Sequence, residues 1–454
     1  MKFQDLLDNV GEAIPAYRGP IFSTIVTGLL VGNCAGTVAG IFRHFACLFV
    51  GTAITRKRLY TFLNSGLIRW ALMWERVAEL LRPHMLVDGR LLVVLDDTTY
   101  GKSGRQISGC DVHFDHSSKP NTSRWIFGHC RVVAGLLVRC HGRWACLPMA
   151  QNNFVAEKDR GKKLTIHSGL QNKTVYTRRQ KRHEKWQKTK CGIAAALVNG
   201  IRLLFGLPVL IVCDSWFGNN NLRRELQRDP DLPEAHILSR LRVSCVLHDV
   251  PEEPETRKRG RRRKYGRRLP PIEALAASMR PKATTDSIVI YGKMRDCTYS
   301  ELVCVSKALK CQVKVVFIHR KNGRFFPLVS TDLTLSAKQM IEYYAARWKI
   351  ESGFKELKHE VGALDSQCRK HNAVENHFNL CCLAMTLTWI YALNRDTAPK
   401  RRHPNQRSSA FAFADIRRAI ADELRGEPIF LKGCPEPVKR AVKIIRDRLF
   451  SSAA

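Results

Sequence analysis

Two apolar runs that end in aspartate constrain the fold of this chain more than any other feature. RLLVVLDD (90–97) and PVLIVCD (208–214) are almost wholly aliphatic before their acids, which is typical of strands buried on both faces of a sheet. A carboxylate in such a place must be hydrogen-bonded, neutralised or bound to a metal ion. A turn or a helix N-cap satisfies such a residue in about half of cases. The runs therefore predict a central sheet with Asp96, Asp97 and Asp214 at its strand ends.

Segments of different composition surround these runs. Apolar residues recur at helical spacing in LIRWALMWERVAELLRPH (67–84), and CGIAAALVNGIRLLFG (191–206) predicts an apolar helix that ends at its last glycine. Residues 336–362 and 373–395 predict two further helices. We expect an α/β protein with a helical N-terminal domain (1–85), the first part of a sheet core (86–239), a β-rich insertion with a basic loop (240–335), helices that complete the core (336–397) and a basic helical tail (398–454).

The charge balance indicates the class of partner. The chain has 75 Lys and Arg against 40 Asp and Glu, a formal net charge of +35, so we expect a polyanionic partner. Residues 19–42 carry no charge over a span of membrane length, but Gly, Ser, Thr and Asn dilute their apolar residues, so we predict no membrane span. The N-terminus lacks the build of a secretory signal, and the 16 cysteines are scattered without a CxxC pair. These features predict a cytoplasmic protein with reduced thiols and no structural zinc.

The segment YYAARWKIESGFKELK (343–358) carries a polar stripe beside an apolar one. At 100° per residue, four polar side chains fall within an arc of about 60°. They are Tyr344, Arg347, Glu351 and Lys358. By itself this stripe is best explained as a ladder of surface ion pairs, each contributing a few tenths of a kcal/mol. Together with the acids at two strand ends, however, it supplies the carboxylates that a divalent-metal site for phosphoryl transfer requires.

In these residues the sequence resembles the DDE transposases of bacterial insertion sequences. The resemblance lies in the spacing Tyr, two residues, Arg, three residues, Glu, six residues, Lys, and in the acids of VLDDTT and VLIVCD. It implies a ribonuclease H-like catalytic core with a β-rich insertion. It also implies cleavage of DNA at transposon ends and transfer of the cut strand to target DNA, by a nucleoid-associated cytoplasmic protein that acts as a homodimer on double-stranded DNA.

By the same resemblance, three acids hold two Mg²⁺ ions, with Mn²⁺ as a substitute. The second and third acids are Asp214 and Glu351. The family's first acid is usually followed two residues later by Thr or Ser, and both Asp96 and Asp97 satisfy this rule. The strand is apolar on both faces, so alternation does not choose between them. We favour Asp97 and retain Asp96 as a candidate metal ligand and catalytic residue.

The remaining candidates are residues that would contact DNA. The resemblance implies that Arg347 and Lys358 hold phosphates and that Tyr344 contacts a phosphate or a displaced base. Trp348 and Trp216 would stack on bases or, more commonly for tryptophan, pack in the core. The basic loop supplies nine cations for the DNA backbone: Arg257, Lys258, Arg259, Arg261, Arg262, Arg263, Lys264, Arg267 and Arg268.

Further basic surface is expected from the strip TRRQKRHEKWQKTK (177–190), and end recognition from the N-terminal helices. Two alternatives to a transposase stay open. A metal-dependent nuclease without strand transfer would use the same site. A catalytically inactive, transposase-derived DNA-binding protein would keep the basic segments without needing the acids.

Overall fold

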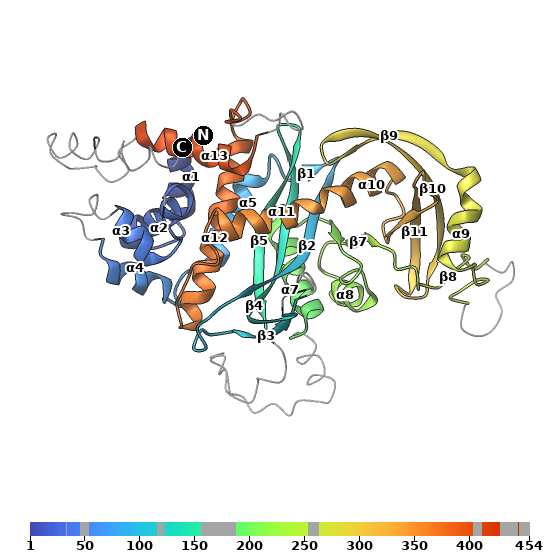
Figure 1. Ribbon diagram of the computed structural model, residues 1–454, viewed down its shortest axis with the longest axis horizontal. Helices are drawn as coiled ribbons and strands as arrows, with labels where there is room; N and C mark the ends of the chain where they lie inside the picture. The colour runs from blue at the N-terminus through green and yellow to red at the C-terminus, as the bar shows by residue number, and fades with distance from the viewer. Residues whose placement is uncertain are drawn as a thin grey trace.

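A large mixed sheet covered by helices forms the centre of the protein (Figure 1). The computed structural model describes residues 1–32, 34–45, 54–115, 121, 123–155, 188–252, 263–402, 411–426 and 444. Within these ranges the chain has a mixed α/β fold, as the alternation of apolar strands and helical segments predicts.

Helices precede the sheet in the chain, lie between its strands and follow it. The N-terminal ones are α1 (Phe3–Gly11), the 3₁₀ turn η1 (Ala16–Arg18), α2 (Gly19–Val31), α3 (Val38–Phe45), α4 (Arg56–Leu63) and α5 (Trp70–Leu81). The later ones are α7 (Lys190–Phe205), α8 (Asn220–Leu226), α9 (Ile272–Met279), η4 (Arg280–Lys282), α10 (Ala337–Ala346), α11 (Trp348–His359), α12 (His371–Leu393) and α13 (Phe413–Gly426). As predicted, α7 ends at Gly206, which takes a left-handed conformation with φ +67°.

The strands form one sheet in the order β3-β4-β2-β6-β7-β12-β11-β10-β8, with β1 beside β2, β5 beside β4 and β9 beside β10. The first six strands are β1 (Leu86–Val87), β2 (Arg90–Gly101), β3 (Asp111–Phe114), β4 (Trp125–Cys140), β5 (Arg143–Phe154) and β6 (Val209–Cys213). The others are β7 (Ala235–Arg240), β8 (Leu247–His248), β9 (Thr284–Ile290), β10 (Lys293–Ser306), β11 (Cys311–His319) and β12 (Phe325–Ser330).

Three neighbouring strands, β2, β6 and β7, run parallel, whereas the other pairings are antiparallel. In the register of this group, Leu95 lies beside Cys213 and Cys213 lies beside Ser239. Because parallel strands point their carboxyl ends to the same edge, the residues that follow these three positions meet there. They are Asp96, Asp214 and Arg240.

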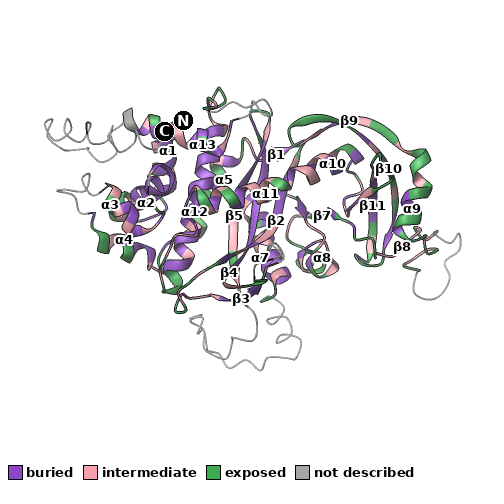
Figure 2. Ribbon diagram, in the orientation of Figure 1, coloured by how far each residue is buried: buried purple, intermediate pink, exposed green. Residues whose placement is uncertain are grey.

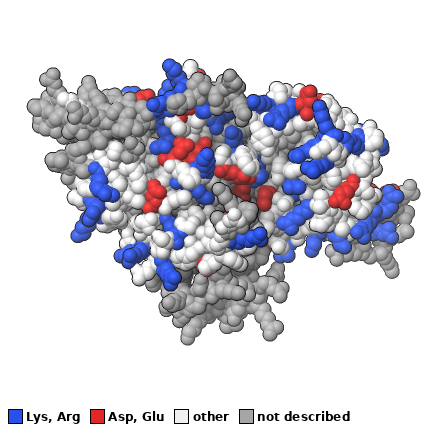
Figure 3. Space-filling view, viewed as in Figure 1, with Lys and Arg blue, Asp and Glu red and all other residues white. Residues whose placement is uncertain are grey.

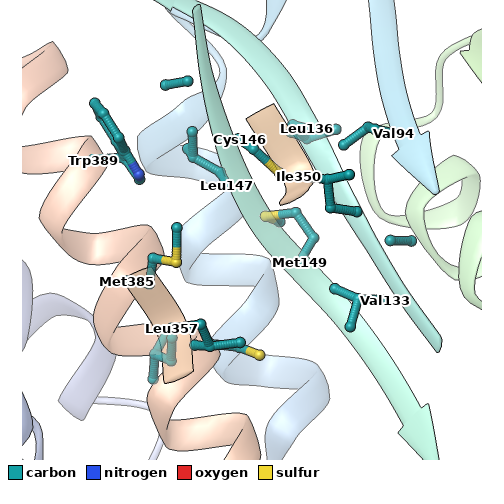
Figure 4. Packing of buried hydrophobic residues seen from close by; sticks show 14 of the residues in the cluster. Val94, Val133, Leu136, Cys146, Leu147, Met149, Ile350, Leu357, Met385 and Trp389 are labelled. Carbon is teal, nitrogen blue, oxygen red and sulfur yellow. The ribbon is translucent and has the colours of Figure 1, made fainter. Parts of the chain in front are cut away.

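Helices cover both faces of the sheet, and the strands between them are largely buried (Figure 2). Helices α11 and α12 pack against β5, and α7 packs against β4 and β5. Figure 4 shows the first of these layers, with side chains from Val94, Val133, Leu136, Cys146, Leu147, Met149, Ile350, Leu357, Met385 and Trp389. Gly353 allows α11 to approach closely, because a Cβ there would lie 3.3 Å from Cε of Met385.

Helices α1 to α4 lie on the far side of α12 from the sheet (Figure 1). Helices α2 and α4 pack on α12, and their buried residues join those of the sheet in one hydrophobic cluster. The β-rich region has a second, smaller cluster that includes Leu247, Ile272 and Phe317. None of the helices in the described ranges combines the length and apolar composition that a bilayer span requires.

The single helix predicted over 336–362 is instead two helices that meet at Arg347. Its N–H bonds to the carbonyls of both Tyr343 and Tyr344, and its own carbonyl accepts from the N–H of Ile350, three residues on. This shorter, 3₁₀-type spacing interrupts the regular ladder of the α-helix. The prediction of one continuous helix was therefore wrong at this position, which periodicity does not reveal because the apolar pattern continues through it. The helix predicted over 373–395 is confirmed as α12.

Candidate active site

Two carboxylates lie next to each other where the parallel pairing of β2 with β6 ends. The prediction that Asp96 and Asp97 end their strand was wrong, because β2 continues to Gly101 in its antiparallel pairing with β4. Leu95 of β2 pairs with Cys213 of β6, and the next residue in each segment is an aspartate, Asp96 and Asp214 respectively. They interact electrostatically, and the charge of Asp214 contributes to raising the pKa of Asp96. Apolar sequence on both sides of each strand thus brings two acids, 118 positions apart in numbering, to one edge of the sheet.

The two consecutive aspartates of β2 point to opposite faces of the sheet, as successive residues of a strand must. Asp96 faces α11, where its Oδ2 lies 3.1 Å from Nη1 of Arg347. Asp97 faces α7, where its Oδ2 lies 2.7 Å from Nζ of Lys190. The structure therefore brings Asp96 together with Asp214, and it places Asp97, the residue favoured from the sequence, on the other face.

Arg347 lies between Asp96 and Glu351. Its Nη2 lies 2.8 Å from Oε1 of Glu351, and its side chain is only 13% exposed. Burial is the main reason that the pKa of Asp96 is raised to about 7, and the charge of Arg347 opposes that rise. The guanidinium of Arg347 thus pairs with the carboxylates of both Asp96 and Glu351. Its charge does not fully offset the cost of burying the Asp96 carboxylate.

Backbone donors hold the carboxylates of Asp96 and Asp214 in place. Oδ1 of Asp96 accepts the N–H of Asp97 at 2.9 Å. Oδ1 of Asp214 accepts the N–H groups of Trp216 and Phe217, each at 3.0 Å. This turn after β6 is tight, since a Cβ at Gly218 would lie 2.1 Å from Oγ of Ser239. Each carboxylate keeps its second oxygen clear of these backbone bonds.

The other residues of the polar stripe occupy different surroundings. Nζ of Lys358 donates to the carbonyl of Thr99 at 3.2 Å, and burial lowers the pKa of Lys358. Tyr344 lies with its ring centroid 5.7 Å from that of Phe326, and burial raises its pKa. Trp348 and Trp216 are 53% and 44% exposed, so neither is a core residue. The stripe is a row of contacts with β2 and β12 rather than a solvent-facing ladder.

The described part of the basic loop lies at the opposite end of the sheet. The backbone of Arg268 forms an isolated antiparallel β-bridge with His248 of β8, and Nε of Arg267 lies 3.3 Å from Oδ2 of Asp249. Strand β8 is five strand spacings of about 4.8 Å from β6. Arg263 and Lys264 also belong to this end. The loop positions Arg257, Lys258, Arg259, Arg261 and Arg262, and residues 177–187 of the second basic strip, lie outside the described residues.

Two cations near the carboxylates are not singled out by the sequence. Lys190, the last residue of the basic strip 177–190, pairs with Asp97. Arg240 ends β7 beside Asp214, and its guanidinium carbon lies 4.8 Å from the ring centroid of Phe326. No ion pair within the described ranges includes Arg240. Only the strand register signals this residue, because nothing in AHILSR distinguishes its arginine.

Charged side chains of opposite sign gather on this face of the protein. Figure 3 shows acidic side chains in the middle of the face, around α11, with Lys and Arg side chains around them and over the β-rich region. Within the described residues, no three His, Cys, Asp or Glu side chains are arranged closely enough to ligate one ion. The guanidinium of Arg347 instead bridges two of the carboxylates.

Comparisons with known proteins add a family. A family model described as DDE superfamily endonuclease matches residues 13–295, which include Asp96, Asp97 and Asp214 and end before Glu351. A comparison with curated protein sequences finds no match. A solved structure, the cryo-EM structure of the piggyBac transposase synaptic complex with hairpin DNA, is 13% identical and has a TM-score of 0.37, covering 94% of this chain and 75% of that one. That score is too low to indicate a shared fold.

Proposed function

Because the chain belongs to the DDE superfamily endonucleases, we propose that it is the transposase of a bacterial insertion sequence, which cuts DNA at transposon ends and joins the cut strand to target DNA. One observation carries the proposal. Asp96 and Glu351, from different elements, both pair with the mostly buried guanidinium of Arg347, and Asp214 follows β6 in the position next to Asp96. Burying the Asp96 carboxylate next to a second acid is costly, so stability alone does not account for the arrangement.

We further propose that β5-β4-β2-β6-β7 is a ribonuclease H-like core. The support is its topology: β2, β4 and β5 form an antiparallel meander, and β6 and β7 then add parallel to β2. Helix α7 precedes β6 and α8 connects β6 to β7. The region from β8 to β12 would be the β-rich insertion, since it lies in the chain between β7 and α10, which contacts β6 and β7.

The carboxylates fit a divalent cation in their chemistry. Their oxygens are the hard ligands that Mg²⁺ and Mn²⁺ prefer, and the raised pKa of Asp96, to about 7, reflects burial that Arg347 alone does not offset. We propose that Asp96, Asp214 and Glu351 hold two such ions, after Arg347 withdraws from between two of them. When bound, the ions would neutralise charge at the scissile phosphate and activate the attacking hydroxyl.

The chain's own residues would hold the reacting strand. The N–H of Asp97 fixes the carboxylate of Asp96, and the turn after β6 fixes that of Asp214. Arg347 and Lys358 lie on the helix beside them and would contact phosphates flanking the scissile bond. Tyr344 would contact the neighbouring nucleotide. The resulting geometry orients the phosphate before reaction, which is the main contribution that a protein makes to phosphoryl transfer.

Arg240 extends this phosphate-binding row. Its stacking on Phe326, which in turn lies against Tyr344, orients the guanidinium at the end of β7 beside Asp214. We predict that Arg240→Ala lowers kcat/KM for DNA cleavage about 10-fold or more and reduces the slope of log affinity against log salt by about 1. Arg295→Ala, which removes an exposed arginine of β10, is the matched control. Equal effects of the two substitutions would mean that Arg240 adds only general positive charge.

Other surfaces would bind DNA without reading its sequence. The cations Arg263, Lys264, Arg267 and Arg268 lie near β8, and the net charge of +35 favours contact with phosphates at several places. We propose double-stranded transposon ends and target DNA as ligands, and a homodimer that pairs two ends. Such a protein would act in the bacterial cytoplasm at the nucleoid.

A joining assay tests the proposed function. Short inverted repeats flanking the gene define the end fragments, which are labelled and incubated with the protein, plasmid and Mg²⁺. We expect strand cleavage at the end of the repeat and covalent joining of its 3′ end to plasmid, both lost in EDTA. Cleavage without joining would support the nuclease alternative. Binding with neither reaction would support the inactive DNA-binding alternative, and either result would overturn the proposal.

A further inference from the structure

Lys190 occupies a position that its own helix does not explain. It is the first residue of α7, where the helix dipole disfavours a cation, and its side chain is 23% exposed. Its partner Asp97 is 25% exposed, and Nζ lies 2.7 Å from Oδ2. Burial acts to lower the pKa of Lys190, but Asp97 and Cys130 outweigh it and the pKa is raised. The pair is therefore formed between elements rather than within the helix.

The same ammonium group contacts the neighbours of the carboxylates of Asp96 and Asp214. Asp97, its ion-pair partner, donates its N–H to Oδ1 of Asp96. Trp216, whose ring centroid lies 5.7 Å from Nζ of Lys190, donates its N–H to Oδ1 of Asp214. The ring of Phe154 lies on another side of the ammonium at 5.5 Å. One lysine is thus linked, through a single residue on each side, to Asp96 and to Asp214.

We propose that Lys190 is a positioning residue. Together with Asp97, on the face of the sheet opposite to Asp96, it fixes the placement of Asp96 relative to Asp214. The inference rests on the proposed function, because it assigns a role in holding the divalent cation that function requires. It also gives the second aspartate of VLDDTT a role of its own. Groups that orient metal ligands without touching the metal commonly affect metal affinity by about 10-fold to 100-fold.

Two other roles for Lys190 make different predictions. A purely structural ion pair would contribute to the free energy of unfolding without affecting the carboxylates on the other face. A lysine that binds the DNA backbone would change DNA affinity and its salt dependence. Substitution of a positioning residue instead weakens metal binding and lowers kcat while leaving DNA binding unchanged.

The decisive measurement is Mn²⁺ binding to the full-length protein without DNA, by electron paramagnetic resonance of free Mn²⁺. For Lys190→Met and for Asp97→Asn we expect about 10-fold weaker binding, a comparable loss of kcat, and an unchanged DNA dissociation constant. The double variant should lose no more than either single one, because both remove the same contact. Lys190→Arg should restore most of the affinity, since it keeps the charge.

Lys314→Met is the matched control, because Lys314 is also a mostly buried lysine of the sheet region, bonded to the carbonyl of Leu335 and 3.8 Å from Glu301. If Lys190→Met and Asp97→Asn match this control in Mn²⁺ affinity and kcat, the inference is wrong, as it is if only DNA affinity changes. Should Lys190→Met fail to fold, Asp97→Asn and Lys190→Arg still decide the question. A wild-type protein that neither binds Mn²⁺ nor cleaves DNA would instead contradict the proposed function itself.

Discussion

Asp96→Asn is expected to abolish metal-dependent DNA cleavage, with a loss of about 10³-fold or more, whereas Asp97→Asn should cost only about 10-fold. The two residues are adjacent and chemically identical, so the comparison isolates position. Asp96 lies beside Asp214 and 3.1 Å from Arg347, while Asp97 lies on the other face with Lys190. Rates are measured on a labelled end fragment at saturating Mg²⁺.

The two substitutions also serve as controls for each other in folding. Both replace a half-buried acid of β2 by its neutral isostere, and both remove one partner from an ion pair, so similar shifts in melting temperature are expected. A difference in cleavage without a difference in melting can therefore be assigned to the site. The reverse ranking, with Asp97→Asn the more damaging, would show that the face of β2 bearing Asp97 carries the reaction.

Asp214→Asn and Glu351→Gln are each expected to eliminate cleavage, again by about 10³-fold or more, while DNA binding stays nearly unchanged. Either substitution removes a carboxylate that the proposed cation needs but leaves the phosphate-binding cations in place. Removing one negative charge also does not weaken attraction to a polyanion. Cleavage is followed as above, and binding by fluorescence anisotropy in Ca²⁺ or EDTA.

Glu342→Gln is the matched control for Glu351→Gln. Glu342 lies on α10, and its Oε1 is 2.9 Å from Arg139, so it is also a helical glutamate paired with an arginine. It should leave cleavage within about twofold, as a contact remote from the carboxylates. Undiminished DNA cleavage by Asp214→Asn or Glu351→Gln would show that the substituted residue is not a metal ligand of the reaction. A loss of DNA binding together with cleavage would point to misfolding.

Sequence patterns predicted the local structure where one physical signal dominated. The aliphatic runs before Asp96 and Asp214 predicted strands, because only burial on both faces favours so continuous an apolar sequence. The apolar helix ending at Gly206 was predicted from the same kind of signal. The break at Arg347 was not predicted, because a single 3₁₀-type turn leaves the apolar periodicity intact.

The sequence named Asp96, Asp97, Asp214 and Glu351 as candidate site residues, but it did not decide between Asp96 and Asp97. Periodicity gave no choice between Asp96 and Asp97, since every residue of LLVVL (91–95) is apolar and no alternation marks either face. Arg240 carried no local signal, and Lys190 was expected only as part of a basic strip, because their contacts depend on which strands are neighbours in the sheet. Contacts between residues far apart in the chain are set by strand order and register, which composition does not encode locally.

The sequence by itself determined that this protein buries strands in which apolar runs lead directly to acids, that it carries a large excess of positive charge, and that Tyr344, Arg347, Glu351 and Lys358 stand at a family's spacing. Only the tertiary structure decided which acids face one another. The parallel register of β2, β6 and β7 aligns one residue from each strand, and the alternation of side chains along β2 sends Asp96 to one face and Asp97 to the other. That alternation is a property of the folded sheet, so it could not be read from two identical letters.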